Sequence, residues 1–205
     1  MAERLKCEIR VEWCSLLTRS PESRMPKKPT VHSRRKLVHT GVFHVEEMEL
    51  EFENGQQRRY QRIVGSPQGA VLVVPLLDAE TVLLIREYAA GMDRYELAFP
   101  KGHIEQGEDP LTAANREIQE ETGYAAERLE QIASFTIAPG YLGHTTHIVL
   151  ASDLYPKRLE GDEPEPIEVV PWKLSALEEL LARHDFTEAR SIAALYRVRD
   201  LLQGV

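Results

Sequence analysis

Four glutamates in one short stretch of the chain could hold a divalent metal ion: Glu108, Glu117, Glu120 and Glu121. The last three stand at i, i+3 and i+4, which places their side chains on one face of an α-helix, within about one turn. Like charges this close repel each other, and a divalent cation removes the repulsion. Because Mg²⁺ and Mn²⁺ prefer oxygen ligands and leave positions for water and phosphate, the spacing indicates metal-assisted chemistry on phosphates.

The neighbouring residues predict the helix that must position these glutamates. Asp109 can cap its start, Pro110 suits its first turn, and Thr122-Gly123 can end it. An apolar stripe beside the glutamate face lets the helix pack while its ligands stay open, and consists of Leu111, Ala114 and Ile118. Arg116 is interpreted as an ion-pair partner that holds the carboxylates in place, with a direct part in the chemistry as the alternative.

The stretch from Gly102 to Tyr124 resembles the Nudix box of the Nudix hydrolases. The matching positions are Gly102, Glu108, Arg116, Glu117, Ile118, Glu120, Glu121, Gly123 and Tyr124. Tyr124 departs mildly, since an aliphatic residue is usual there. So many specified positions at fixed spacing favour the motif over its alternative, a chance acidic helix.

The resemblance implies metal ligands at three glutamates and at one main-chain carbonyl: Glu117, Glu120, Glu121, and Ala98 or Gly102. Glu108 then either orients the other glutamates or reaches a metal through water. The implied reaction is attack on one phosphorus by a metal-activated water. In related ADP-ribose hydrolases the general base lies in an acidic loop late in the domain. Glu163 and Glu165 lie in such a loop, Glu160 to Glu165, for which a solvated turn is the alternative.

The resemblance extends beyond the box to bacterial Nudix hydrolases of ADP compounds. It is carried by segments such as LIREYAAGMDRYEL, SFTIAPGY and DLYPKRLEGDEPEP. Such enzymes cleave the pyrophosphate of ADP-ribose, NADH and short diadenosine polyphosphates, and release AMP and a second phosphate product. Pro139 matches a position associated with ADP-ribose-type substrates. Tyr141 and His144 follow it as candidate substrate contacts, with ordinary packing as the alternative.

Two departures put a strict preference for ADP-ribose in question. The box begins with Pro100-Lys101-Gly102 rather than Pro-Ala-Gly, and Ala89 stands where many such enzymes carry an arginine. Lys101 or Arg86 could supply the missing positive charge to the substrate phosphates. For Arg86 a surface charge at a strand end is an equal alternative.

The composition limits the class of protein. The chain has 205 residues, of which 42% are hydrophobic and 28% charged, enough for one sizeable core plus an appendage. A net charge of −8 without a basic stripe argues against nucleic acid as a partner. No apolar run reaches the length of a membrane span. Cys7 and Cys14 are the only cysteines and suggest a reducing, cytoplasmic setting rather than a disulfide framework.

Three regions are expected along the chain. Residues 1–24 lack the long apolar core of a signal peptide and are either an upstream extension, since Met25 follows, or a genuine short arm. Residues 25–65 are expected to contain an antiparallel β-hairpin. Residues 66–205 are expected to form the Nudix hydrolase domain, of α/β class with a mixed sheet in an α/β/α sandwich.

The hairpin is predicted by alternating residues from Val42 to Phe52, an Asn54-Gly55 turn and a return strand from Arg58 to Val64. Its apolar face comprises Met48, Leu50 and Phe52. In ADP-ribose-type Nudix enzymes such a hairpin pairs with a second subunit and helps to bind the adenine, which implies a homodimer. A flap that covers the edge of the core is the alternative.

The elements of the main domain follow from periodicity. Near-continuous apolar runs predict central strands at Ala70–Leu77 and Thr81–Tyr88, with a short strand at Tyr95–Phe99 before the box. The remaining predicted elements are strands at Leu129–Ala138, Thr145–Asp153 and Val169–Trp172, and helices at Ser175–Ala182 and Thr187–Gln203.

A nucleotide-binding sensor without catalysis is the competing function. Nudix domains of that kind have usually lost box glutamates, whereas all of them are present here, and no DNA-binding segment is attached. We therefore expect a hydrolase that acts on a small nucleotide substrate.

Overall fold

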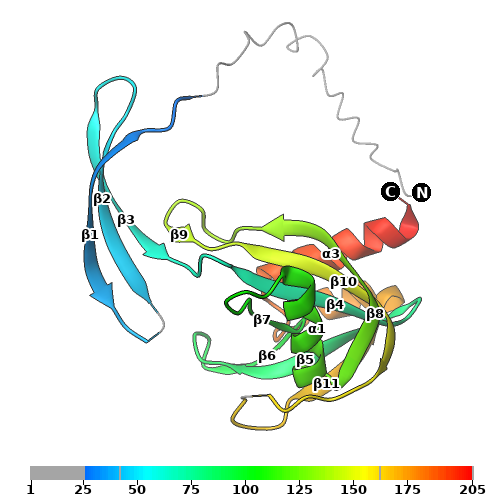
Figure 1. Ribbon diagram of the computed structural model, residues 1–205. Helices are drawn as coiled ribbons and strands as arrows, with labels where there is room; N and C mark the ends of the chain where they lie inside the picture. Colours follow the sequence, from blue (N-terminus) through cyan, green and yellow to red (C-terminus); the bar gives the residue numbers. More distant parts are fainter. Residues whose placement is uncertain (1–25, 42, 162, 205) are drawn as a thin grey trace, which may run out of the picture.

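The computed structural model describes residues 26–41, 43–161 and 163–204. The extension expected at residues 1–24 lies outside them. A small N-terminal sheet projects from a larger body (Figure 1). It has the strand order β1-β2-β3-β9 and consists of β1 (Thr30–His39), β2 (His44–Glu51), β3 (Gln57–Val64) and β9 (Leu142–Gly143). None of the described helices is long and apolar enough to cross a membrane.

The predicted hairpin is present as β2 and β3, joined by a turn in which Gly55 has a φ of +75°. A further strand, β1, extends it on the other side of β2 and was not predicted. Its basic and polar side chains face acidic ones on β2, as in the pairs Arg35–Glu47 at 2.9 Å and Ser33–Glu49 at 3.0 Å. Strand β1 is held by cross-strand charge pairs rather than by an apolar face. Its sequence therefore lacks the hydrophobic periodicity by which a strand can be predicted.

The body is built on a mixed sheet with the strand order β11-β5-β4-β10-β8. Its strands are β4 (Ala70–Asp78), β5 (Thr81–Ala89), β8 (Tyr124–Phe135), β10 (Thr146–Pro156) and β11 (Glu168–Lys173), with β6 (Arg94–Ala98) paired to β5 and β7 (Lys101–His103) to β4. The predicted central strands are confirmed as β4 and β5. Strand β8 begins directly after the box, earlier than expected, and β7 and β9 are short strands that periodicity did not reveal.

Helices cover both faces of this sheet, which confirms the predicted sandwich (Figure 1). They are α1 (Pro110–Glu121), α2 (Leu177–Leu181) and α3 (Ala189–Gln203), with a short 3-10 turn at Leu174–Ala176. Successive side chains of a strand point to opposite faces. Leu72 and Val74 of β4 therefore join the core under α2 and α3, while Val71 and Val73 join the core under α1.

Helix α1 is the element that positions the box. The carboxylate of Asp109 accepts hydrogen bonds from the backbone N–H groups of Leu111 and Thr112, as a helix cap should, and the helix ends before Gly123, whose φ is +79°. Ala114 and Ile118 are fully buried against the sheet. Since one side of α1 is fixed by this packing, its acidic side chains lie at the edge of the sheet beside β6 and β7.

Candidate active site

Two carboxylates at the inner edge of the box, Glu117 and Glu121, are buried. Their side chains belong to residues only 7% and 4% exposed, and Glu121 Oε2 accepts a hydrogen bond of 3.0 Å from the backbone N–H of Lys101. Burial raises the pKa of Glu121 to about 9 and that of Glu117 to about 7, although Arg116 acts on Glu117 in the opposite direction. The fold therefore holds two carboxylates away from water, where their charged forms are disfavoured.

The glycine that opens the box makes room for one of these carboxylates. A Cβ placed on Gly102 would overlap the carboxylate of Glu117. Gly102 pairs with Val71 in the ladder between β7 and β4, so its backbone cannot move aside without breaking the sheet. Close approach of strand and carboxylate thus explains why this position needs glycine.

Arg116 ties the outer part of the box together. Its guanidinium donates hydrogen bonds to Glu108 at 3.0 and 3.1 Å, to Glu117 at 2.8 Å, to Glu120 at 3.0 Å and to the carbonyl of His103 at 2.9 Å. The hydrogen bond from Arg116 lowers the pKa of Glu108. This geometry agrees with the predicted role of Arg116 as an ion-pair partner.

No three acidic or histidine side chains in the described part of the chain already converge as a complete set of metal ligands. The reason is local, since Arg116 lies between Glu117 and Glu120, and Glu121 faces the main chain of Lys101. The chemistry of the donors nevertheless fits a hard divalent cation, because three carboxylates lie within about one helical turn and two of them are buried. Gly102 lies on β7, the strand whose Lys101 N–H binds Glu121, and Ala98 ends β6.

The acidic loop, defined here as residues 157–161 and 163–167, crosses the end of α1. The backbone N–H of Lys157 donates to the carbonyl of Gly123 at 3.0 Å, and that of Leu159 to the carbonyl of Gln119 at 3.2 Å. The loop lines a cleft of about 590 Å³ that also includes Glu120 of the box. Residues far apart in the sequence are thereby brought to one site.

The two glutamates proposed as bases have different surroundings. Both line the cleft with Glu120, but of the two it is the charge of Glu163 that helps to raise the pKa of Glu117. Glu165 is exposed, and its Oε1 accepts a hydrogen bond of 2.5 Å from the hydroxyl of Tyr95 on β6. Tyr95 was not singled out in the sequence, where it reads as one more residue of a short strand.

The predicted substrate contacts lie in three places. Arg86 forms ion pairs with Asp185 at 2.6 Å and Glu168 at 2.8 Å, which supports a structural role. Lys101 pairs with Glu87 at 2.7 Å and lines a cleft of about 430 Å³. Glu87, like Tyr95, was missed in the sequence, although its charge helps to raise the pKa of Glu121.

Pro139 and Tyr141 lie on a separate loop before β9. Both are exposed, Tyr141 to 59%. The carbonyl of Tyr141 accepts a hydrogen bond of 2.7 Å from the backbone N–H of Ile63 on β3. This loop therefore joins the body to the N-terminal sheet.

The sequence is similar to known protein families and to characterised relatives. The NUDIX domain family matches residues 66–195, and the NudE-type Nudix hydrolase N-terminal domain matches residues 29–62. The chain is 44% identical over 182 residues to ADP compounds hydrolase NudE of Escherichia coli (strain K12), covering 89% of this chain and 97% of that protein. It is 32% identical over 165 residues to the ADP-ribose pyrophosphatase of Bacillus subtilis (strain 168), covering 78% of this chain and 87% of that protein.

A solved structure agrees with these relatives. A crystal structure of ADP compounds hydrolase matches with a TM-score of 0.83 at 44% identity, covering 89% of this chain and 98% of that chain. The predicted box, the sandwich and the N-terminal sheet therefore point to the same family. The chain belongs to the Nudix hydrolases, as a pyrophosphohydrolase with a NudE-type N-terminal domain.

Proposed function

We propose that this chain hydrolyses the pyrophosphate bond of ADP-linked compounds with the help of Mg²⁺ or Mn²⁺. The proposed substrates are ADP-ribose, NADH and short diadenosine polyphosphates, and the products are AMP and a second phosphate compound. The observation that carries this proposal is the buried pair of box carboxylates, Glu117 and Glu121, together with a third acidic residue, Glu163, whose charge helps to raise the pKa of Glu117. The substrate class is supported by the names of the relatives in Escherichia coli and Bacillus subtilis.

The residues that would hold the ion are the three box glutamates, with a main-chain carbonyl of Ala98 or Gly102: Glu117, Glu120 and Glu121. A bound divalent cation would neutralise phosphate charge and make a water molecule more acidic. Nudix hydrolases generally use divalent metal ions, and the choice of Mg²⁺ or Mn²⁺ is part of this proposal. Arg116 and Glu108 keep the acidic side chains in place through their paired hydrogen bonds.

Glu163 is the proposed general base. It accepts a proton from the attacking water, whose oxygen bonds to phosphorus while the anhydride P–O bond breaks and the leaving phosphate takes the bonding electrons. Its position supports this role, because its charge acts on Glu117 of the box, whereas Glu165 in the same cleft is hydrogen-bonded to Tyr95. Lys101 is proposed to attract the substrate phosphates from the neighbouring cleft.

A homodimer formed through the N-terminal sheets is proposed to complete the site. The sheet exposes apolar side chains, among them Val38, Phe43 and Tyr60, that nothing in the described part of the chain covers. Strand β3 of that sheet contacts the loop that carries Pro139 and Tyr141. A second subunit on this sheet would therefore lie near a loop proposed to contact the adenosine part of the substrate.

The test is AMP release from ADP-ribose with and without Mg²⁺, followed by a panel at fixed Mg²⁺ that contains NADH, diadenosine polyphosphates and nucleoside triphosphates. We expect metal-dependent release of AMP and a preference for ADP-ribose and NADH over triphosphates. A clear preference for a triphosphate such as dGTP would contradict the substrate class, and nucleotide binding without turnover in either metal would contradict the catalytic function.

A further inference from the structure

We propose that the hydrogen bond between Tyr95 and Glu165 positions Glu163 over the box, so that Tyr95 is a positioning residue for hydrolysis and Glu165 is its partner rather than the base. This inference rests on the proposed function. Its starting point is that the acidic loop supplies two glutamates with the same chemistry, and both line the cleft beside Glu120. They differ in their contacts: the carboxylate of Glu163 lies against Gly161, where an added Cβ would also lie 3.5 Å from Cβ of Glu120, whereas Glu165 accepts the hydrogen bond of Tyr95.

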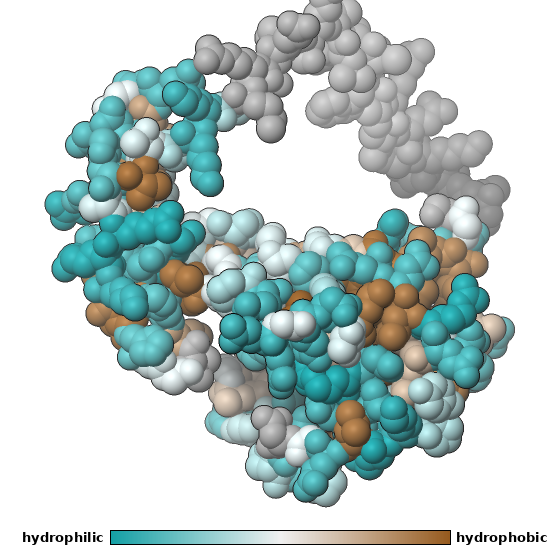
Figure 2. Space-filling model, viewed as in Figure 1, coloured by the Kyte–Doolittle hydropathy of each residue, from teal (hydrophilic) through white to brown (hydrophobic). Residues whose placement is uncertain are grey.

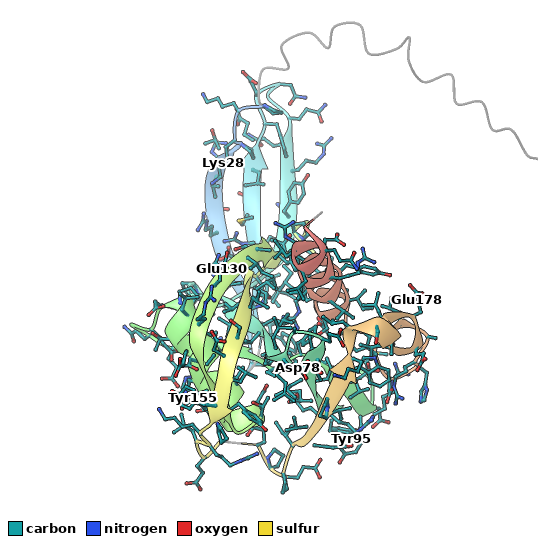
Figure 3. All side chains as sticks on the ribbon, turned by 90° about the vertical axis from the view of Figure 1, so that its right-hand side faces the viewer. Lys28, Asp78, Tyr95, Glu130, Tyr155 and Glu178 are labelled. Atoms are coloured by element: carbon teal, nitrogen blue, oxygen red, sulfur yellow. The ribbon has the colours of Figure 1, made fainter. Side chains whose placement is uncertain are left out.

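The acidic loop is held at its start and at its end by contacts with the body, and Tyr95 provides a contact between them. At its start, backbone hydrogen bonds join Lys157 to Gly123 and Leu159 to Gln119. At its end the chain enters β11, where Glu168 forms an ion pair with Arg86. Figure 3 labels Tyr155, where the segment leaves β10, and Tyr95 on the opposite side, near the start of β11. The hydroxyl of Tyr95 is thus placed to hold the second half of the loop.

Tyr95 is itself held in one orientation. It lies opposite Tyr88 in the ladder between β5 and β6, and the two rings meet edge to face with centroids 5.5 Å apart. The hydroxyl of Tyr88 donates in turn to Asp93 at 2.5 Å in the turn between these strands. A ring fixed by its neighbour loses little further freedom when its hydroxyl binds Glu165, so the hydrogen bond can define the position of the loop.

The chain between the two glutamates is stiff. The sequence reads Glu163-Pro164-Glu165-Pro166, and each proline fixes its own φ and restricts the residue before it to extended conformations. A displacement of Glu165 is therefore passed to Glu163 rather than absorbed between them. Gly161 also restricts Glu163, because the two lie in close contact. A Cβ on Gly161 would overlap the carboxylate of Glu163 and lie 3.5 Å from Cβ of Glu120.

The hydroxyl of Tyr95 is protonated and can therefore donate a hydrogen bond. The nearby charge and hydrogen bond of Glu165 raise the pKa of Tyr95, so the phenol keeps its proton throughout the neutral range. A charge-assisted O–H···O⁻ bond of this length is among the stronger side-chain hydrogen bonds. Because Oε1 of Glu165 already accepts this hydrogen bond, we assign the positioning contact to Glu165 and the proton transfer to Glu163.

The test is a set of variants that separates the hydrogen bond from the negative charge of Glu165. Tyr95→Phe keeps the ring and removes the donor. Glu165→Ala removes the acceptor, whereas Glu165→Gln keeps an amide oxygen that can accept from Tyr95 but cannot act as a base. We expect Tyr95→Phe and Glu165→Ala each to lower kcat for ADP-ribose roughly 10-fold with little change in KM, because the base is displaced while substrate contacts remain.

Two further comparisons make the result decisive. The double variant Tyr95→Phe/Glu165→Ala should lose no more than either single variant, since both break the same hydrogen bond. Glu165→Gln should restore most of the turnover lost in Glu165→Ala, whereas Glu163→Gln should lose roughly 10²-fold. Tyr196→Phe, on α3 across the sheet, is the matched control and should equal the wild type. Thermal melts of every variant show whether the fold is kept.

Equal loss in Glu165→Gln and Glu165→Ala would overturn the proposal, because it would make the carboxylate itself the base. Additive losses in the double variant would overturn it as well. Failure of the proposed function looks different, since the wild type would then release no AMP from any ADP compound under the same conditions.

Discussion

The N-terminal sheet and the sheet of the body are stabilised in different ways. In the body, the central strands β4 and β5 are buried on both faces, with residues such as Val73 and Leu84 fully excluded from solvent. In the N-terminal sheet, β1 is exposed along almost its whole length, and the strands are joined by cross-strand ion pairs such as Arg35–Glu47 and Arg62–Glu46. Figure 2 shows it as a mostly hydrophilic arm with isolated apolar residues, set beside the body.

The difference shows which part can stand alone. Burial of apolar surface within one subunit contributes about 25 cal/mol per Å² to the free energy of unfolding, whereas exposed ion pairs contribute little. A small sheet whose buried apolar side chains are few, Leu50 being the main one, is marginal in water. The body therefore supplies the stability and the proposed metal ligands, and we propose that the N-terminal sheet serves association. Four changes test this division, in order of expected effect.

The largest effect is expected where the body performs its chemistry. Glu121→Gln removes a proposed metal ligand but little volume, and should lower turnover by roughly 10²-fold or more, on the order of 3 kcal/mol of transition-state stabilisation. The melting temperature without metal should not fall, because burial raises the pKa of Glu121 to about 9, so its carboxyl is largely uncharged near pH 7 and glutamine replaces it at similar volume. The control is Glu130→Gln on β8, which is exposed and should keep wild-type turnover. Near-normal turnover in folded Glu121→Gln would refute the assignment.

The next effect concerns stability of the body. Hydrogen bonds from Arg183 and from Arg86 hold the pKa of Asp185 below its usual range, and its side chain is 8% exposed. Asp185→Asn should cost about 2 kcal/mol in urea unfolding at pH 7, because two arginines lose their partner.

The pH dependence of that loss follows from the direction of the shift. A carboxyl group whose pKa is lower in the folded state stabilises the fold above its unfolded pKa of about 3.9, and this contribution fades as the pH falls through the folded value. The loss of unfolding free energy in Asp185→Asn should thus be largest at pH 7 and smaller at about pH 3. A deficit of equal size at both pH values would show that the charge of Asp185 is not its source. Asp200→Asn, at a half-exposed pair with Arg199, is the control.

Separating the two regions should have a moderate effect. A chain that starts at Gly65 lacks β1 to β3 and keeps every box glutamate. It should remain folded, become a monomer in light scattering, and lose roughly 10-fold or more in kcat/KM for ADP-ribose, equivalent to about 1.4 kcal/mol. Persistence of a dimer, or a full-length chain that is already monomeric, would contradict the role assigned to the N-terminal sheet.

The smallest effect is expected at an ion pair of the N-terminal sheet. Arg35→Ala removes the partner of Glu47 from exposed β1. The melting temperature should change by less than about 1 °C, because the pair is screened by water and salt. A drop of several degrees would mean that these ion pairs stabilise the molecule as much as the core does.

Local patterns were enough to predict much of the fold. The box helix has its own cap, first-turn proline, apolar stripe and terminating glycine, so α1 was predicted correctly from residues adjacent in the chain. Strands β4 and β5 were equally visible as apolar runs. Strands β1, β7 and β9 were missed because none of them carries a periodic apolar face of its own. Strands β7 and β9 in addition depend on pairing with strands that are distant in the chain.

The order of residues along the chain determined the family, the acidic helix and the set of candidate glutamates, because these depend on residue type and short-range spacing. It left Glu163 and Glu165 equivalent, with the same chemistry in the same loop. Tertiary contacts made them different: the loop crosses α1 so that the charge of Glu163 acts on Glu117, while β6 places the hydroxyl of Tyr95 against Glu165. Likewise, burial of Glu117 and Glu121 and the pairing of Arg86 with Asp185 arise only when distant segments pack together, since burial and charge partners depend on position in space rather than in the chain.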